Sequence, residues 1–212
     1  RRMGTETSTA GTIVPTGIQV GSGVKTASTT RIMSQGSLEN TGKELDVAIR
    51  GEGFFQIQMP DGTTAYTRDG SFERDADGTM VTVDGYTVNP GIDIPENARD
   101  LTISADGTVQ AVDENGATLN LGQLELARFV NKSGLEAIGD NLFLESPASG
   151  PANLGTPGAV GFGTVLQGFL ENSNVNAVNE ISALILAQRA YEMNSKVITT
   201  SDEMLGVTSQ LR

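Results

Sequence analysis

The segment DGTTAYTRDGSFERDADGTMVTVDGYTV, residues 61–88, carries four Asp-Gly dipeptides separated by short runs rich in Thr, Val and aromatic residues. Asp-Gly supplies the positive-φ positions of type I′ hairpin turns, and the runs between them have the length and side chains of strands. Further Asp-Gly and Asn-Gly dipeptides follow at 106–107 and 115–116. The pattern predicts successive β-hairpins. We therefore expect a β-rich domain, a barrel or a folded sheet, over residues 37–165.

The composition argues against catalysis and against a cofactor. The chain has 212 residues, of which 37% are hydrophobic and 5% aromatic, and it contains neither Cys nor His. Disulfides, His- or Cys-ligated zinc and a Ser-His-Asp triad therefore cannot be built. The formal net charge is −12, which disfavours nucleic acid because phosphate neutralisation needs a basic face. No run approaches the roughly 20 apolar residues of a membrane span. We expect no enzyme activity, no metal, no cofactor and no small-molecule substrate.

Two motifs have the outline of ligand-binding loops, and we interpret both as β structure. GEGFFQ, residues 51–56, lacks the third glycine and the following helix of a dinucleotide fingerprint. It is interpreted as a strand turn after which Phe54 and Phe55 face opposite sides of a sheet. RDADGT, residues 74–79, has only two of the alternating acids of a calcium loop. It is interpreted as a hairpin turn.

Residues 1–36 are rich in Thr, Ser and Gly, and Pro15 and several glycines exclude a helix from the first part of this segment. We expect an extended arm here. Its apolar side chains alternate in a pattern that a purely solvated linker would not need: Ile13, Val14, Ile18, Val20 and Val24. We hypothesise that this arm lies between subunits of an assembly and wedges their outer domains in place. A disordered terminus or a flexible tether is the alternative.

The C-terminal segment, residues 166–212, differs from everything before it. A Pro/Gly-rich connector at 146–164 precedes it, and the side chains of Ser173, Asn174 and Asn176 provide N-cap chemistry. These features predict a helix from near Asn176 to about residue 210, roughly 50 Å long at 1.5 Å per residue.

An apolar stripe recurs along this predicted helix every seven residues and is widened at its start. Its members are Ala177, Leu184, Tyr191, Ile198 and Leu205, with Val178, Ile181 and Ile185 beside them. The stripe is longer than a domain of this size can easily cover, which predicts a coiled-coil-like partner. The alternative is a helix that packs on its own β domain.

Three blocks of the sequence resemble the flagellar rod and hook family. They are SQGSLENTGKELDVAIRGEGFFQI (34–57), DGTTAYTRDGSFERDADGTMVTVDGYTV (61–88) and LENSNVNAVNEISALILAQRAYEMNSKVITTSDEMLG (170–206). The segment TGIQVGSGV (16–24) and the compact middle domain are most similar to the distal rod members of the family. Proximal rod and hook proteins are the alternatives within it.

The resemblance implies a structural subunit of the bacterial flagellum. Family members are exported by the flagellar type III apparatus without a cleaved signal peptide and polymerise into a helical tube across the periplasm, which passes motor torque to the hook for swimming. N- and C-terminal helices form an inner coiled-coil layer with the β domain outside, and the N-terminal helix has no counterpart in this sequence. The implied partners are other copies of the chain, proximal rod and hook proteins, and surrounding ring proteins. The implied polymer interface is Asn174, Val178, Ile181, Leu184, Ile185, Tyr191, Ile198 and Leu205.

A polysaccharide-binding or polysaccharide-hydrolysing β domain with an oligomerising helix is the hypothesis from another class. Asp and Glu are plentiful enough for a glycosidase pair, but most lie beside turn glycines, and few aromatic residues exist to form a sugar platform. A ligand pocket would favour this hypothesis, and filament formation would favour the structural subunit.

Overall fold

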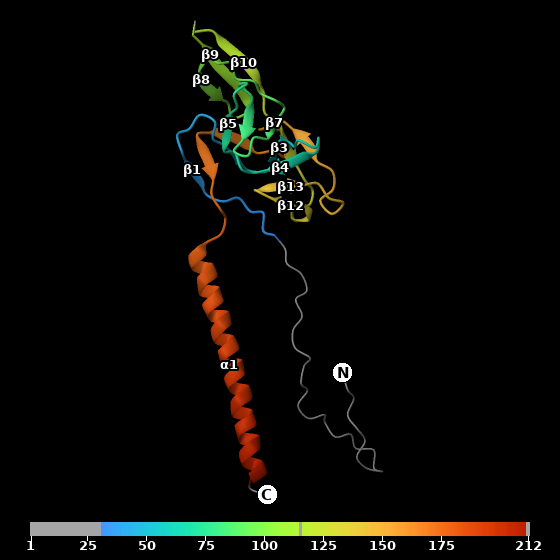
Figure 1. Ribbon diagram of the computed structural model, residues 1–212, viewed down its shortest axis with the longest axis vertical. Coiled ribbons are helices and arrows are strands. Elements are labelled where there is room, and N and C mark those ends of the chain that lie inside the picture. The colour runs from blue at the N-terminus through green and yellow to red at the C-terminus, as the bar shows by residue number, and fades with distance from the viewer. Residues whose placement is uncertain (1–30, 115, 211–212) are drawn as a thin grey trace. The chain divides into compact units, whose positions relative to one another are not determined.

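The computed structural model describes residues 31–114 and 116–210, with side chains as far as Met204. Within this part, sixteen strands and one 3-10 turn are followed by a single long helix (Figure 1). The expected fold class, mainly β with a long C-terminal helix, is confirmed. The expected arm lies outside the described residues except for its last few positions. The elements are β1 (Leu38–Asn40), β2 (Val47–Arg50), β3 (Phe54–Gln58), β4 (Thr64–Thr67), β5 (Phe72–Arg74), β6 (Met80–Thr82), β7 (Thr87–Asn89), β8 (Ala98–Ile103), β9 (Thr108–Asp113), β10 (Thr118–Gln123), β11 (Leu126–Arg128), η1 (Lys132–Gly134), β12 (Glu136–Gly139), β13 (Leu142–Leu144), β14 (Asn153–Gly155), β15 (Thr164–Gln167), β16 (Phe169–Glu171) and α1 (Ala177–Gln210).

The strands form four antiparallel sheets. The nine-stranded sheet has the order β12-β13-β4-β3-β7-β6-β5, and β11 joins it by pairing with both β3 and β14. A three-stranded sheet has the order β10-β9-β8, and two further pairs join β15 to β2 and β1 to β16. β15 pairs with β2, and β16 pairs with β1. The first and last strands of the β body are therefore hydrogen-bonded to each other.

Two hydrophobic clusters fill the β body, one on each face of β3. Phe55 and Ile57 belong to the main cluster, and both are fully buried. Phe54 points to the opposite face, where it packs with Tyr66 and Phe129 in edge-to-face ring contacts. The interpretation of GEGFFQ as a turn followed by a two-sided strand is confirmed.

Four of the five Asp-Gly dipeptides mark hairpin loops, but their predicted turn type is wrong. At Gly62, Gly78, Gly85 and Gly107 only the glycine has positive φ, and its N–H bonds the carbonyl three residues earlier. This is the three-residue loop in which a type I turn is followed by a left-handed glycine. The RDADGT loop is one of these turns. Within the described chain, positive φ at two successive non-glycine residues occurs only at Asp140–Asn141, between β12 and β13.

The hairpin turn predicted at Gly70 is absent. Gly70 was expected to form a hairpin turn with Asp69, but its φ lies outside the left-handed region. A Cβ at this position would lie 1.8 Å from the carbonyl oxygen of Val47, and the Val47 N–H bonds the Gly70 carbonyl at 3.0 Å. Glycine is needed here because two backbone segments approach closely.

The Pro/Gly-rich segment at 146–164 is part of the β body rather than a free connector. β14 within it pairs with β11, and β15 and β16 follow it directly. Val165, at the expected domain boundary, is 2% exposed. The strands therefore continue to Glu171, because the ladders with β1 and β2 satisfy the backbone of residues 164–171.

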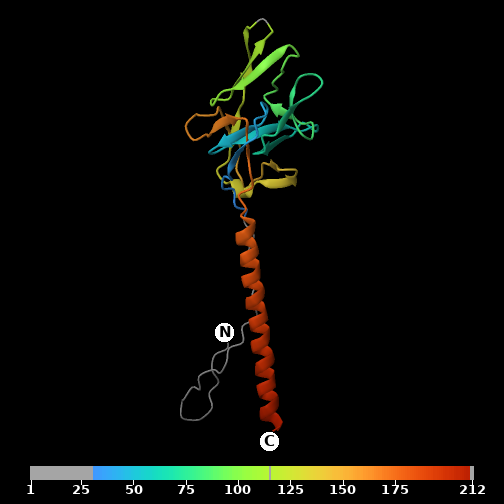
Figure 2. The ribbon, with the colours of Figure 1, turned by 90° about the vertical axis from the view of Figure 1, so that its left-hand side faces the viewer.

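The helix begins where its sequence predicted. The Asn176 side-chain oxygen accepts hydrogen bonds from the N–H groups of Val178 and Asn179 at 3.1 and 3.2 Å, which caps the first turn. From Ala177 the helix runs without interruption to Gln210 (Figure 2).

Candidate assembly surface

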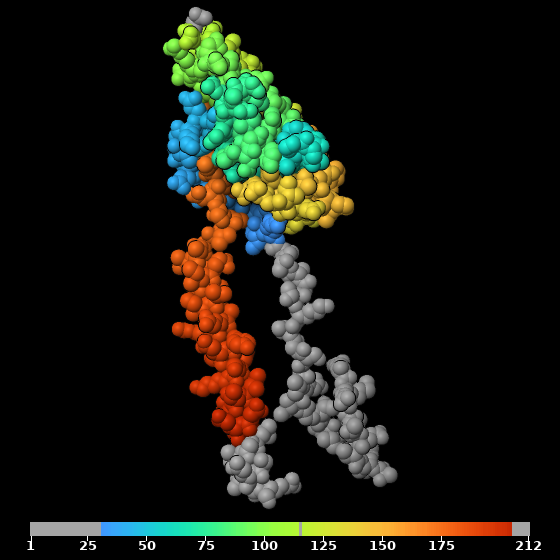
Figure 3. Space-filling view, viewed as in Figure 1, coloured from blue at the N-terminus to red at the C-terminus, as the bar shows by residue number. Residues whose placement is uncertain are grey.

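Every described side chain of α1, from Ala177 to Met204, is exposed, and these side chains stand out along the helix in Figure 3. The predicted interface residues on this stretch are between 45% (Ile185) and 76% (Tyr191) exposed. The others are Val178, Ile181, Leu184 and Ile198. Leu205 lies on α1, but its side chain is outside the described residues, as are the arm residues Ile13, Val14, Ile18, Val20 and Val24.

A second apolar line on the same helix was not predicted. Leu186, Met193, Val197 and Met204 follow one another at intervals of 7, 4 and 7 residues, and each is between 63% and 67% exposed. Such intervals keep residues on one side of a helix. The helical spacing of these four residues is visible in the sequence, but only the stripe through Leu184 and Tyr191 was interpreted as an apolar face.

Charged residues of the middle of α1 gather on a third side. Arg189, Glu192, Lys196 and Glu203 follow at intervals of 3, 4 and 7 residues, which again places them on one line. Both signs alternate along it. This charged line suits contact with water, whereas the two apolar lines are exposed surface of the kind that marks a protein contact.

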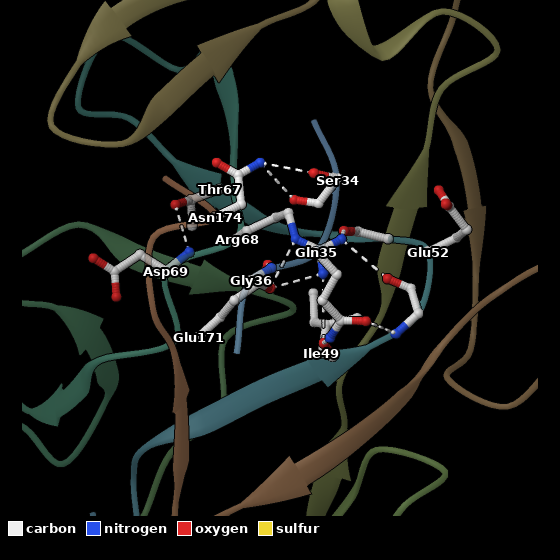
Figure 4. A network of polar contacts seen from close by, with 12 residues as sticks. Ser34, Gln35, Gly36, Ile49, Glu52, Thr67, Arg68, Asp69, Glu171 and Asn174 are labelled. Atoms are coloured by element: carbon white, nitrogen blue, oxygen red, sulfur yellow. Dashed lines mark hydrogen bonds and ion pairs between the residues drawn. The ribbon is translucent and has the colours of Figure 1, made fainter. Parts of the chain in front are cut away.

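The chain enters and leaves the β body at a single junction. β1 pairs with β16 in antiparallel register from Leu38↔Glu171 to Asn40↔Phe169, and the N–H of Asn172 donates to the Ser37 carbonyl at 2.8 Å. Residues 32–36 and 172–174 therefore run side by side, which Figure 4 shows at the labelled residues.

Arg68 binds the leaving half of this junction at Glu171 and uses all five of its N–H donors. Nε and Nη2 donate to Glu171 Oε2 at 3.0 and 2.8 Å, so that β4 is tied to the last strand. The remaining donors bind the carbonyls of Ile49, Gly51 and Gly53 at 3.0–3.4 Å. The side chains of Arg68 and Glu171 are only 17% and 12% exposed, so this ion pair is largely shielded from solvent.

The entering segment closes the same network. The N–H of Gly36 donates to the other carboxylate oxygen of Glu171 at 2.8 Å. A Cβ on Gly36 would lie 1.8 Å from the Asn172 carbonyl oxygen, so the two segments approach too closely for any other residue. Gln35 donates to the Ile49 carbonyl and accepts from the Gly51 N–H. Four segments distant in sequence thus meet at one guanidinium and one carboxylate.

Asn174, predicted to lie in the polymer interface, makes contacts within this chain. Its side-chain nitrogen lies 3.1 Å from the Ile32 carbonyl, 2.9 Å from the Ser34 carbonyl and 3.0 Å from Ser34 Oγ. It therefore holds the entering segment beside the segment that leads into α1. Sequence reasoning had no signal for these pairings, because more than 100 residues separate the partners.

No helix in the described part of the chain combines the length and the apolar character that a membrane span requires.

Two family models match the chain. The model of the flagellar hook protein FlgE/F/G D1 domain matches residues 48–111, and that of the flagellar basal body rod FlgEFG protein C-terminal region matches residues 166–211. The first begins in β2 and ends in β9, and the second begins in β15 and includes all of α1. The β body and the helix together thus define a protein of the flagellar rod-and-hook class.

Whole-chain relatives narrow this class. The flagellar basal-body rod protein FlgG of Caulobacter vibrioides is 57% identical over all of this chain and 81% of its own length. The FlgG protein of Bacillus subtilis is 46% identical over 88% of this chain and 72% of its own length. The rod protein FlgF of Escherichia coli is 36% identical over 84% of this chain and 72% of its own length. The chain belongs to the FlgG family of flagellar basal-body rod proteins and is a structural subunit of the flagellum.

Proposed function

We propose that the chain forms the distal part of the rod by assembling through α1 into a helical tube, and that this tube passes motor torque to the hook. The single observation that carries the proposal is the continuous exposure of apolar side chains along α1. Burying one such side chain contributes about 1.5–3 kcal/mol. Several on one helix supply enough free energy to drive association once neighbouring copies cover them.

The junction supports the mechanical part of the proposal. A helix that only assembles would need no firm attachment to its β body. Here the segment that leads into α1 is tied to the β body by a strand pair and a shielded ion pair, and the Asn174 amide holds it beside the entering segment. A force applied to the helix therefore reaches the β body through several short contacts rather than through a loose linker.

The remaining parts of the proposal concern place and partners. The tube crosses the periplasm, and the chain reaches it through the flagellar type III apparatus without a cleaved signal peptide. At its two ends it contacts proximal rod and hook proteins, and ring proteins surround it. The names of the relatives, which place them in the flagellar basal body, support this location.

The test replaces three exposed apolar residues of α1 by aspartate: Leu184→Asp, Tyr191→Asp and Ile198→Asp. Charges in a buried seam cost several kcal/mol each unless paired. Cells that carry this triple variant should lose motility and rods, while the purified protein keeps the β-sheet circular dichroism and melting temperature of the parent.

The matched control introduces the same three aspartates on the charged line of the same helix, as Arg189→Asp, Glu192→Asp and Lys196→Asp. This variant has a similar loss of helix propensity but leaves the apolar residues intact, so rods and motility should remain. Motile cells with the Leu184, Tyr191 and Ile198 changes would refute assembly through α1.

A further inference from the structure

β2, one of the first strands of the β body, depends on a strand from the far end of the chain. Among the strands that the structure describes, its one hydrogen-bonded partner is β15. Ile49 of β2 and Val165 of β15 lie directly opposite each other, are 0% and 2% exposed, and belong to the main hydrophobic cluster. The ladder of β2 can therefore form only when residues 164–167 are present.

One side chain of β15 joins three segments of the chain. Gln167 Nε2 donates to the carbonyls of Glu44 and Leu101 at 2.9 and 2.7 Å, and Gln167 Oε1 accepts from the N–H of Ile103 at 3.0 Å. Leu101 and Ile103 lie in β8, whereas Glu44 lies 123 residues before Gln167. Gln167 thus holds the three-stranded sheet beside the beginning of the β body.

Further hydrogen bonds on both sides of β15 show the same pattern. Three backbone N–H groups donate to distant carbonyls: Gly163 to Glu52 at 2.7 Å, Val165 to Ala105 at 3.2 Å and Gly168 to Asp46 at 2.7 Å. Glu171 then binds Arg68 and Gly36 (Figure 4). We name residues 163–171 the closing segment. Without it, these distant groups lose their hydrogen-bond partners, and an unpaired buried polar group is strongly destabilising.

The closing segment is also the last part of the β body to be made. A polypeptide appears from its N-terminus onward, so every strand from β1 to β14 precedes this segment. Local hairpins such as β3–β4 and β5–β6 have both of their strands earlier, but an isolated hairpin is only marginally stable. Because the net stability of a domain is a small difference between large terms, losing the contacts of the closing segment removes the fold rather than loosening it.

We propose that the closing segment is a folding switch: the β body stays unfolded until residues 163–171 have emerged, and it then folds in one cooperative step. The inference rests on the proposed function for its use, because a subunit that passes through an export apparatus has to stay unfolded until it has passed. α1 begins a few residues after the closing segment. The β body therefore closes just before the assembly helix is completed.

Halting synthesis of the full chain at defined points tests the switch. The complete gene is translated with a stalling sequence behind residue 161, 175 or 212, after a spacer long enough to clear the ribosome. Limited proteolysis of the stalled chains measures the population of unfolded β body. We expect cleavage within residues 38–160 to be at least about tenfold faster in chains halted at 161 than in chains halted at 175. Chains halted at 175 and at 212 should be cleaved at equal rates.

A matched pair of substitutions separates packing of the closing segment from chain length. Val165 is buried in the main cluster, whereas Val160, five residues earlier, is fully exposed. In the chain halted at 175, Val165→Asp places a charge in the core and should be cleaved as fast as the chain halted at 161. Val160→Asp should be cleaved as slowly as the parent.

Three results would overturn the inference. Slow cleavage of the chain halted at 161 would show that the β body folds without the closing segment. Fast cleavage at 175 with slow cleavage at 212 would show that folding waits for α1. Slow cleavage of Val165→Asp at 175 would show that chain length alone matters. If cells lacking the chain still built complete rods, the proposed function would fail while the order of folding stood, so the two failures are distinguishable.

Discussion

Replacing Glu171 by glutamine tests whether the junction network holds the β body together. Glu171 accepts hydrogen bonds at both carboxylate oxygens, from Gly36 N–H on one side and from Arg68 Nε and Nη2 on the other. A glutamine side chain has a similar shape but accepts at only one of these positions, because the other becomes an NH₂ donor. In Glu171→Gln, either Gly36 or Arg68 therefore faces a donor, and Arg68 loses its counter-charge.

The magnitude follows from the shielding of the pair. Hydrogen bonds to charged groups contribute about 1.5–3 kcal/mol, and breaking a fully buried pair costs about 3–5 kcal/mol. The side chains of Arg68 and Glu171 are 17% and 12% exposed, so solvent relieves part of this penalty. We expect Glu171→Gln to lower the free energy of unfolding by about 2–4 kcal/mol. At about 2–4 °C per kcal/mol for a protein of this size, the melting temperature falls by roughly 5–15 °C.

The chain offers a matched control in its exposed ion pair. Arg99 Nη2 lies 3.2 Å from Glu114 Oε1, and these side chains are 67% and 61% exposed. Exposed pairs contribute about 0–1 kcal/mol, so Glu114→Gln should change the stability by less than about 1 kcal/mol. Urea unfolding of both variants and the parent, followed by circular dichroism at pH 7, gives the two differences. Equal losses for Glu171→Gln and Glu114→Gln would show that the junction pair is not a stabilising contact.

Three further outcomes are expected. Burial, and to a lesser extent the charge of Glu145, raises the pKa of Tyr66; the folded protein then keeps a phenolic proton that the unfolded chain loses near pH 10, so stability falls as the pH rises above about 10. Tyr66→Phe should reduce this fall in urea titrations between about pH 9.5 and 11.5, and an unchanged profile would contradict the burial argument. Backbone amides of residues 178–204 should exchange with deuterium rapidly in the isolated chain and slowly in assembled rods, because most helical stability comes from burying an apolar face; strong protection in a proven monomer would favour a helix that packs on its own β body. Deletion of residues 13–24 should give curved or flexible rods if the arm wedges outer domains, as the sequence predicts, whereas rods as straight as the parent's would make the arm a tether.

Local signals explain what was predicted correctly. The Asn176 cap and the apolar repeat determine the start and the type of α1, because both act within a few residues of chain. Apart from Asp69-Gly70, the Asp-Gly dipeptides place hairpin loops correctly, since glycine is the residue that most readily adopts positive φ. The predicted turn type was wrong, because the choice between a two-residue and a three-residue loop also depends on the register of the flanking strands.

The sequence by itself determined the β-rich body, its main hairpins, the long capped helix and the apolar stripe through Leu184, Tyr191 and Ile198. The second apolar line, which includes Leu186 and Met193, also follows from the helical period of the sequence, and the structure shows that both side chains are exposed. Tertiary structure alone decided the junction, where Arg68 meets Glu171 across 103 residues of chain, and the role of Gly70, which is set by the approach of Val47. These contacts depend on which distant segments the folded sheets bring together, and no periodicity or dipeptide along the chain encodes a distance between two such segments.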